Sequence, residues 1–156
     1  MLASLKALID RVLAMLHKLE WLGPLLVRLT LGLVFATTGW GKLHDLDRVK
    51  TFFESLHIPA PGAQAVFVSL VEFVGGLLLM VGLGTRIAAA LLIGVMTVAI
   101  LTAKLGDIDG VTDLAGTQEF VYLVAFVWLV LRGAGAASLD HVIARREPVA
   151  RYHPRG

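Results

Sequence analysis

The chain has 156 residues, of which 57% are hydrophobic, and its mean hydropathy is +0.80. Soluble domains are usually about 45–50% apolar, so we expect an integral membrane protein rather than a soluble protein with a large core. A net charge of only +2 gives no case for a nucleic-acid partner. The absence of cysteine excludes disulfides, thiol redox motifs and cysteine-ligated metal centres within the chain.

The first twenty residues predict an amphipathic helix. Apolar side chains recur there at helical spacing from Leu2 to Leu19, while Lys6, Asp10 and Arg11 interrupt the run. This pattern is typical of a helix that lies on a membrane surface and differs from a cleavable signal peptide. We therefore expect three parts: an interfacial helix at 1–20, a membrane domain at 21–140 and a cytoplasmic tail at 141–156.

Four apolar runs follow, and each is a candidate to cross the bilayer. They cover residues 22–41, 63–83, 87–103 and 115–134. A spanning helix needs roughly 20 residues, and the most apolar part of the fourth run is shorter than this. Gly84 suits a helix C-cap and Thr85 the next N-cap, so the second and third runs should form a tight hairpin. We predict an all-α, four-helix transmembrane bundle with an N-terminal amphipathic surface helix.

The distribution of basic residues predicts the orientation, because cytoplasmic loops carry an excess of lysine and arginine. We expect a multi-pass protein of the cell inner membrane with both termini in the cytoplasm. The inner segments then carry Lys6, Arg11, Lys18, Arg86, Arg132, Arg145, Arg146, Arg151 and Arg155, and the outer loops carry only Lys42, Arg48, Lys50 and Lys104.

Small residues predict where helices approach each other closely, because packing rather than water exclusion drives helix association in a membrane. Gly32 and Ala36 lie four residues apart in the first run, and Ala90 and Gly94 in the third. Gly75 and Gly76 lie together in the second run. Beyond Arg132, Ser138 suits the N-cap of a short helix with Asp140 in its first turn.

Two charges inside apolar runs are the first candidates for a functional site. Glu72 lies near the middle of the second run and Arg28 near the inner end of the first. Their estimated depths predict that they meet, with Arg86 within reach of the same network. Two interpretations stay open: a cavity for a polar headgroup such as that of a quinone, with Glu72 exchanging protons and Arg28 stabilising negative charge, or an ion pair that only fixes helix register.

A second group of charges is predicted at the outer mouth of the bundle. Lys42, Lys104 and Glu119 all fall at or just inside helix ends. They either ring an opening or are ordinary snorkelling side chains. The five histidines lie outside the apolar runs, so we expect neither an intramembrane haem nor a metal site.

Three stretches resemble the DoxX family of small bacterial four-helix membrane proteins. They are RLTLGLVFATTGWGKL (Arg28–Leu43), EFVGGLLLMVGLGTRIAA (Glu72–Ala89) and RGAGAASLD (Arg132–Asp140). The resemblance extends from about Leu25 to Asp140, with Arg28, Gly39 and Lys42 at family-like places. It implies the fold and the location more firmly than an activity, since some related proteins are subunits of membrane oxidoreductases that pass electrons to quinone, while others accompany redox-stress or cofactor-maturation proteins.

We therefore expect an accessory or quinone-linked subunit of a membrane redox system. Since the chain lacks cysteine, intramembrane haem ligands and flavin motifs, this role needs a bound quinone or a membrane or soluble oxidoreductase partner that carries the cofactor. The alternatives are a small-molecule transporter or ligand-binding protein that works as a homo-oligomer, and a structural scaffold. A bound lipid is the other candidate ligand, and the sequence leaves open whether the chain is an enzyme.

Overall fold

The structure is a computed structural model that describes residues 2–146, and every regular element in this range is helical. The all-α prediction is therefore confirmed for the described residues. The elements are α1 (Leu2–Leu19), α2 (Leu22–His44), α3 (Leu46–Ser55), α4 (Pro61–Val81), α5 (Thr85–Ala99), the π-helical turn η1 (Ile100–Lys104), the 3-10 turn η2 (Leu105–Asp107), α6 (Val111–Gly116), α7 (Gln118–Arg132) and α8 (Leu139–Arg146).

Within the described range, three helical segments are long and apolar enough to cross a membrane. They are α2, α4 and the continuous segment formed by α5 and η1. The 23 residues of α2 span about 35 Å at 1.5 Å per residue. By contrast, the 15 residues of α7 span about 22 Å, which is less than the roughly 30 Å hydrocarbon core. The all-α membrane fold is confirmed, and the fourth crossing stays a prediction.

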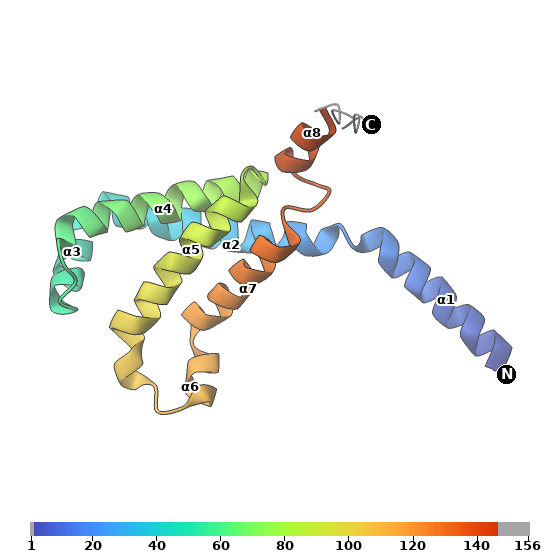
Figure 1. Ribbon diagram of the computed structural model, residues 1–156, viewed down its shortest axis with the longest axis horizontal. Coiled ribbons are helices and arrows are strands. Elements are labelled where there is room, and N and C mark those ends of the chain that lie inside the picture. Colours follow the sequence, from blue (N-terminus) through green and yellow to red (C-terminus); the bar gives the residue numbers. More distant parts are fainter. Residues whose placement is uncertain (1, 147–156) are drawn as a thin grey trace, which may run out of the picture.

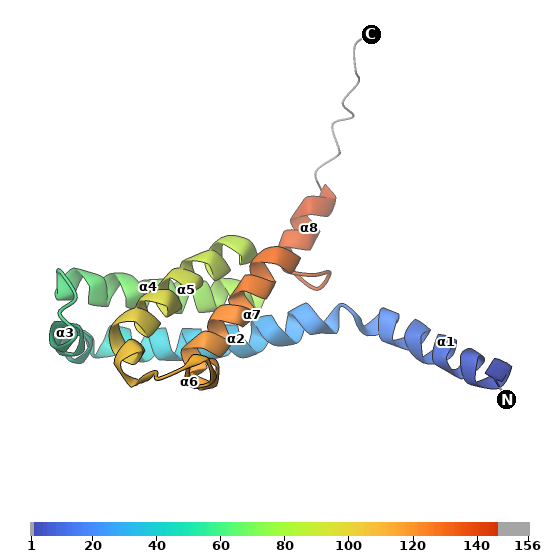
Figure 2. The same cartoon turned by 60° about the horizontal axis from the view of Figure 1, so that its bottom comes forward.

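The bundle is built from two helix pairs. α2 and α4 lie antiparallel along most of their lengths, and α5 packs on α7 and also on α4 (Figure 1). α3 packs across one end of α4, while α1 and α8 lie at the opposite end (Figure 2). We call these the α3 end and the α8 end of the bundle. In both views α1 projects away from the bundle.

Glycines set the close approach of α2 to α4. A Cβ atom added at Gly76 would overlap the backbone of Ala36, and one at Gly32 would lie 2.8 Å from the Gly76 carbonyl oxygen. The predicted contact through Gly32, Ala36 and Gly76 is thus confirmed. The prediction for Ala90 and Gly94 is wrong: Ala90 is exposed, and a Cβ at Gly94 would meet nothing within 4 Å.

An aromatic contact joins the two pairs. The ring of Phe35 on α2 lies edge-on to Tyr122 and Phe126 of α7, with centroids 5.4 and 5.1 Å apart. Such T-shaped pairs stabilise packing beyond their buried area. The outer surface of the bundle is apolar instead of charged, as Leu33 and Leu131 illustrate, and this is the surface that the acyl chains of a bilayer cover.

The turn between α4 and α5 is tight, as predicted, but its caps differ from the prediction. The C-cap of α4 is Gly82, whose φ of 70° and N–H bond to the Leu78 carbonyl end the helix. Thr85 is the first residue of α5, and the carboxylate of Asp140 accepts its N–H at 3.0 Å and that of Gly84 at 2.7 Å. The residues next to Thr85 do not predict this cap, because the capping carboxylate belongs to a residue 55 positions away in the chain.

The predicted start of α8 is confirmed. The hydroxyl of Ser138 accepts the backbone N–H of His141 at 3.1 Å, as an N-cap does. Residues 141–146 of the expected tail are helical, and the rest of that tail lies outside the described residues.

Candidate functional site

Glu72 forms its ion pair with Lys42 rather than with Arg28. Glu72 is 2% exposed in the middle of α4, and its Oε1 accepts a hydrogen bond from Lys42 Nζ at 2.6 Å. Gly39 makes this contact possible, because any side chain there would overlap the backbone of Phe73. Lys42 lies three residues further along α2 and so shares this face of the helix.

Arg28 lies level with the opposite end of α4, which is why the predicted Arg28–Glu72 contact does not form. Its guanidinium occupies the space that a Cβ of Gly82 would fill, whereas Gly39 lies beside Glu72. Arg28 and Gly39 are separated by about 16 Å of helix at 1.5 Å per residue. Gly82, just after the end of α4, lies beside Arg28, which is six residues inside α2, so α2 begins about 9 Å beyond the end of α4.

A pocket of about 790 Å³ opens beside the Lys42–Glu72 pair, at the α3 end of the bundle. Its walls are mostly aromatic and aliphatic, and a second ion pair, Lys104–Glu119 at 3.8 Å, lies on its rim. We call this space the α4–α5 pocket. Its lining consists of Lys42, Phe52, Phe53, Leu56, Ile58, Gln64, Phe67, Val68, Glu72, Ala90, Leu91, Gly94, Val95, Met96, Val98, Ala99, Thr102, Ala103, Lys104 and Glu119.

The small residues of α5 create this pocket. Ala90 and Gly94, expected at a helix contact, line the pocket instead and leave room between α5 and α4. The π-helical turn at the end of α5 places Lys104 on the same wall. Such π-helical turns occur frequently at functional sites. The structure therefore brings Glu72 together with the expected outer-mouth cluster of Lys42, Lys104 and Glu119.

The carboxylate of Glu72 has one free oxygen. Oε2 is buried and has no hydrogen-bond partner among the described residues. An unpartnered buried carboxylate oxygen costs free energy, and the oxygen can accept a hydrogen bond or carry a proton. Together with the Lys42 ammonium it offers one acceptor or acid and one donor beside an apolar cavity, which is the usual composition of a small-molecule site.

At the α8 end, Arg28 and Asp140 tie the C-terminal segment to the bundle. Arg28 donates a hydrogen bond to the Ala137 carbonyl at 2.6 Å, and the Asp140 N–H donates to the Gly82 carbonyl at 2.9 Å. Arg28 is 1% exposed, and its Nε and one Nη have no partner among the described residues. The sequence did not predict that Asp140 binds the turn between α4 and α5, although Asp140 ends one of the three stretches that resemble the DoxX family.

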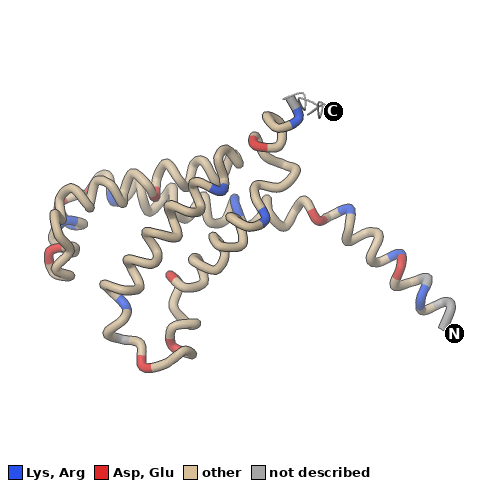
Figure 3. Tube along the Cα trace, viewed as in Figure 1, with Lys and Arg blue, Asp and Glu red and all other residues tan. Residues whose placement is uncertain are grey.

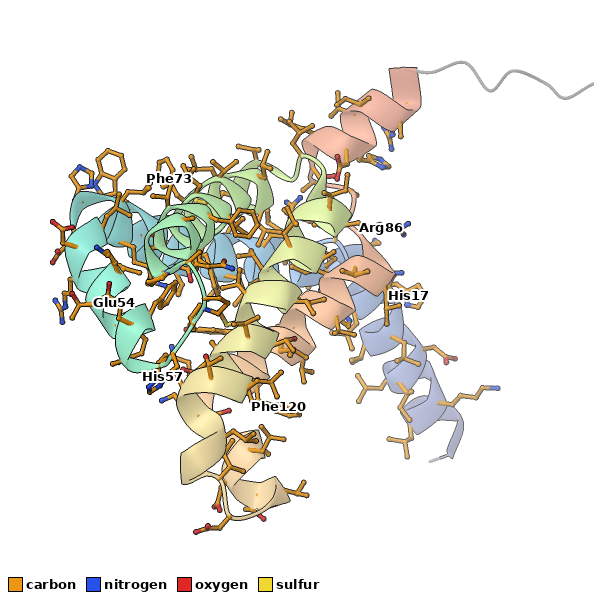
Figure 4. All side chains as sticks on the ribbon, turned by 60° about the vertical axis from the view of Figure 1, so that its left-hand side comes forward. His17, Glu54, His57, Phe73, Arg86 and Phe120 are labelled. Carbon is orange, nitrogen blue, oxygen red and sulfur yellow. The ribbon has the colours of Figure 1, made fainter. Side chains whose placement is uncertain are left out.

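Arg86 joins neither Glu72 nor Arg28. It is exposed in the first turn of α5 and lies toward the same end of the molecule as His17, away from His57 and Phe120 (Figure 4). The expected network of Arg28, Glu72 and Arg86 is thus divided between the two ends of the bundle. No group of three or more histidine, aspartate or glutamate side chains suited to a metal ion occurs in the described part of the chain.

Comparison with known proteins agrees with this architecture. The sequence model of the DoxX family matches residues 23–105, which is more than half of the chain. The chain is 28% identical to the inner membrane protein YqjF of Escherichia coli (strain K12), over 84% of this chain and 99% of that protein. No solved structure matches the chain.

Two further relatives show higher identity over most of their length. The chain is 31% identical to the Bacillus subtilis (strain 168) protein named "Putative oxidoreductase CatD", over 76% of this chain and 85% of that protein. It is 34% identical to the uncharacterized membrane protein Rv3486 of Mycobacterium tuberculosis (strain ATCC 25618 / H37Rv), over 77% and 80%. These matches, together with the three helical segments that are long and apolar enough to span a membrane, show that the chain is a membrane protein of the DoxX family.

Proposed function

We propose that the protein is a quinone-linked accessory subunit of a membrane redox system and that the α4–α5 pocket is its quinone site. The observation that carries the proposal is the buried Glu72 carboxylate, paired with Lys42 at 2.6 Å on the wall of a mostly apolar pocket. Ligand pockets typically have volumes of about 300–1,000 Å³, and this pocket, at about 790 Å³, lies within that range.

The pocket suits a ring that carries two polar oxygens. Phe52, Phe53 and Phe67 supply apolar and aromatic contacts for the ring. Lys42 and Lys104 supply ammonium donors for the carbonyl oxygens. The free Oε2 of Glu72 supplies the proton-exchanging group, because a positioned carboxyl can transfer a proton to or from a bound oxygen.

A bound quinone would accept two electrons and two protons, and the residues of this chain would supply only binding and proton transfer. We propose that Lys42 would stabilise negative charge on the quinone oxygen and that Glu72 would relay both protons in turn, each taken up from water at the mouth of the pocket. The electrons then come from an oxidoreductase partner, membrane-bound or soluble, that holds its own cofactor. The Bacillus subtilis relative, itself named "Putative oxidoreductase CatD", supports a redox role in general.

The first test is quinone binding by the detergent-purified chain, measured by equilibrium dialysis with decylubiquinone. We expect Glu72→Gln to bind about tenfold more weakly, because one charged hydrogen-bonding group is lost. The matched control is Glu54→Gln, which removes an exposed carboxylate from a surface pair on α3. Lipid extraction and mass spectrometry of the wild-type protein should also yield co-purified quinone.

A second variant separates binding from stability. Gly94→Leu fills the pocket from a position where an added Cβ meets nothing within 4 Å, so it should abolish binding without altering the ion pair. Wild-type protein that neither co-purifies with quinone nor binds decylubiquinone would overturn the proposal. Unchanged binding with lowered stability in Glu72→Gln would instead assign the Lys42–Glu72 pair to the structural scaffold.

We also propose the membrane orientation and the division into parts. With both termini in the cytoplasm, the α8 end faces inward and the α4–α5 pocket faces outward, in agreement with the excess of arginine at the α8 end. Location in a bacterial inner membrane is supported by the Escherichia coli relative, which is named an inner membrane protein. Residues 1–20 then form an interfacial helix, and residues 21–140 form the membrane domain.

A further inference from the structure

A second pocket lies at the α8 end, far from Glu72. It has a volume of about 880 Å³ and lies between the end of α1, the start of α5 and the segment that follows α7. Arg86, Arg132, His17 and His141 line it. Lysines and arginines gather where α2, α5 and α7 meet (Figure 3). We call this space the basic pocket.

The two arginines of the basic pocket are available for an anion. Among the described residues, neither Arg86 nor Arg132 forms an ion pair. The guanidinium of Arg86 lies 3.4 Å from the position of a Cβ on Gly133, the residue directly after Arg132. The guanidinium of Arg86 therefore lies beside the backbone at the end of α7, next to the residue that carries the second guanidinium.

The carboxylates of the basic pocket are already occupied. Glu20 lies 3.5 Å from the ring of His17. Asp140 accepts the two N–H groups of the α4–α5 turn, and its charge is further opposed by the buried Arg28. With Arg28 beside Asp140, three arginines stand against two carboxylates at this end of the bundle, which leaves an excess of one positive charge.

Apolar surface adjoins these charges. Ile87 follows Arg86 and is 72% exposed, and Leu131 precedes Arg132 and is 75% exposed. Trp21, also on the pocket wall, is 43% exposed, and tryptophan is enriched where a membrane meets water. A ligand that fits this surface carries an anionic head and long apolar chains.

We propose that the basic pocket binds the headgroup of an anionic phospholipid. Arg86 and Arg132 hold the phosphate, because the guanidinium fork matches phosphate oxygens. The acyl chains lie along the exposed apolar side chains of α5 and α7. Basic pockets between membrane helices on the cytoplasmic side are a known type of site for anionic headgroups. This inference does not depend on the quinone proposal, since the two pockets share no residue.

Native mass spectrometry of the detergent-purified chain, titrated with phosphatidylglycerol or phosphatidylcholine, tests this. We expect wild type to prefer phosphatidylglycerol. Arg86→Gln/Arg132→Gln should bind it about thirtyfold more weakly, because each of the two basic contacts contributes about fivefold. Binding of phosphatidylcholine should stay the same. The charge-matched control is Arg48→Gln/Lys50→Gln on α3, which should keep the preference.

Three results would overturn the proposal. They are equal binding of the two lipids by wild type, an unchanged preference in Arg86→Gln/Arg132→Gln, and an equal loss in the α3 control. Displacement of phosphatidylglycerol by inorganic phosphate at similar concentration would instead assign the pocket to a free anion and overturn the lipid site. The single variants Arg86→Gln and Arg132→Gln provide the same comparison with half the charge removed, should the double variant not fold.

Discussion

The two members of the Lys42–Glu72 pair differ in their access to solvent. The Glu72 side chain is 3% exposed and that of Lys42 is 35% exposed. Loss of Lys42 therefore leaves a buried charge without a partner, whereas loss of the Glu72 charge leaves an ammonium that reaches the boundary by snorkelling. The energetic consequences of the two substitutions should differ for this reason.

We expect Lys42→Met to lower the free energy of unfolding by about 3 kcal/mol and Glu72→Gln by about 1 kcal/mol. The double variant Lys42→Met/Glu72→Gln should recover most of the loss, because no buried charge remains. The measurement is denaturant-induced loss of helical circular dichroism in detergent. Lys50→Met, in a surface pair at 3.7 Å with both side chains 51% exposed, should cost less than about 0.5 kcal/mol. A larger loss for Glu72→Gln than for Lys42→Met would contradict this assignment.

For Asp140, the neighbouring residues predict its place in a helix but not the groups that its side chain binds. Its position in the first turn of α8 follows from the sequence, and the Ser138 cap beside it is confirmed. Its carboxylate, however, caps α5 through the N–H groups of Gly84 and Thr85. No local pattern identifies a cap that arrives from another part of the fold.

At the scale of the helices, small residues have two different roles that look alike in sequence. Gly76 lies against the backbone of Ala36, whereas Gly94 faces open space on the wall of the α4–α5 pocket. Both belong to pairs of small residues in apolar helices. The partner helix alone decides which pair is a contact and which is a cavity.

This difference predicts opposite outcomes for the same substitution. Gly76→Ala should lower the free energy of unfolding by about 1–3 kcal/mol, because the added methyl meets backbone that cannot yield without separating α2 and α4. Gly94→Ala should be neutral or slightly stabilising, since alanine is the better helix former. Thermal unfolding of both variants in detergent provides the comparison, and equal destabilisation would refute the assigned α2–α4 contact.

The apolar residues of α1 are left uncovered by the part of the chain that the structure describes. Leu8, Val12 and Leu16 are all about half exposed, and α1 projects from the bundle. We expect this face to lie in the membrane interface. Since the chain has no cysteine, single nitroxide labels on Val12→Cys and Ala14→Cys, on opposite faces of the helix, test this in liposomes. Val12 should be accessible to oxygen and Ala14 to a water-soluble nickel reagent, whereas equal exposure of both labels to the nickel reagent would place α1 in water.

At the scale of the whole molecule, the two ends of the bundle carry different chemistry. The α3 end holds the Lys42–Glu72 pair and a largely apolar pocket, and the α8 end holds the basic pocket. The arginine excess predicts that the α8 end faces the cytoplasm. This orientation decides which side of the membrane supplies each ligand.

The absence of cysteine makes this orientation directly testable. We expect Ser55→Cys, at the end of α3, to react with a membrane-impermeant maleimide in intact spheroplasts. Ala144→Cys, on α8, should react only after permeabilisation. Both positions are exposed in the structure. The reverse pattern would invert the topology and place the α4–α5 pocket on the cytoplasmic side.

The sequence by itself determined the fold class, the family and which charges lie inside apolar helices. Apolar runs of helical length leave few alternatives in a membrane, because every backbone N–H and C=O must be bonded within the segment. It also identified Glu72, Lys42, Lys104 and Glu119 as candidates, although it placed Glu72 in a different group from the other three.

Only the tertiary structure decided which charge meets which. A shift of a few residues between antiparallel helices changes every cross-helix contact, and that register is set by the glycine contacts around Gly39 and Gly76. It places Arg28 about 16 Å of helix away from the level of Glu72 and brings Lys42 to it instead. The sequence shows which residues are charged, but which of them form ion pairs depends on how closely the two helix backbones approach.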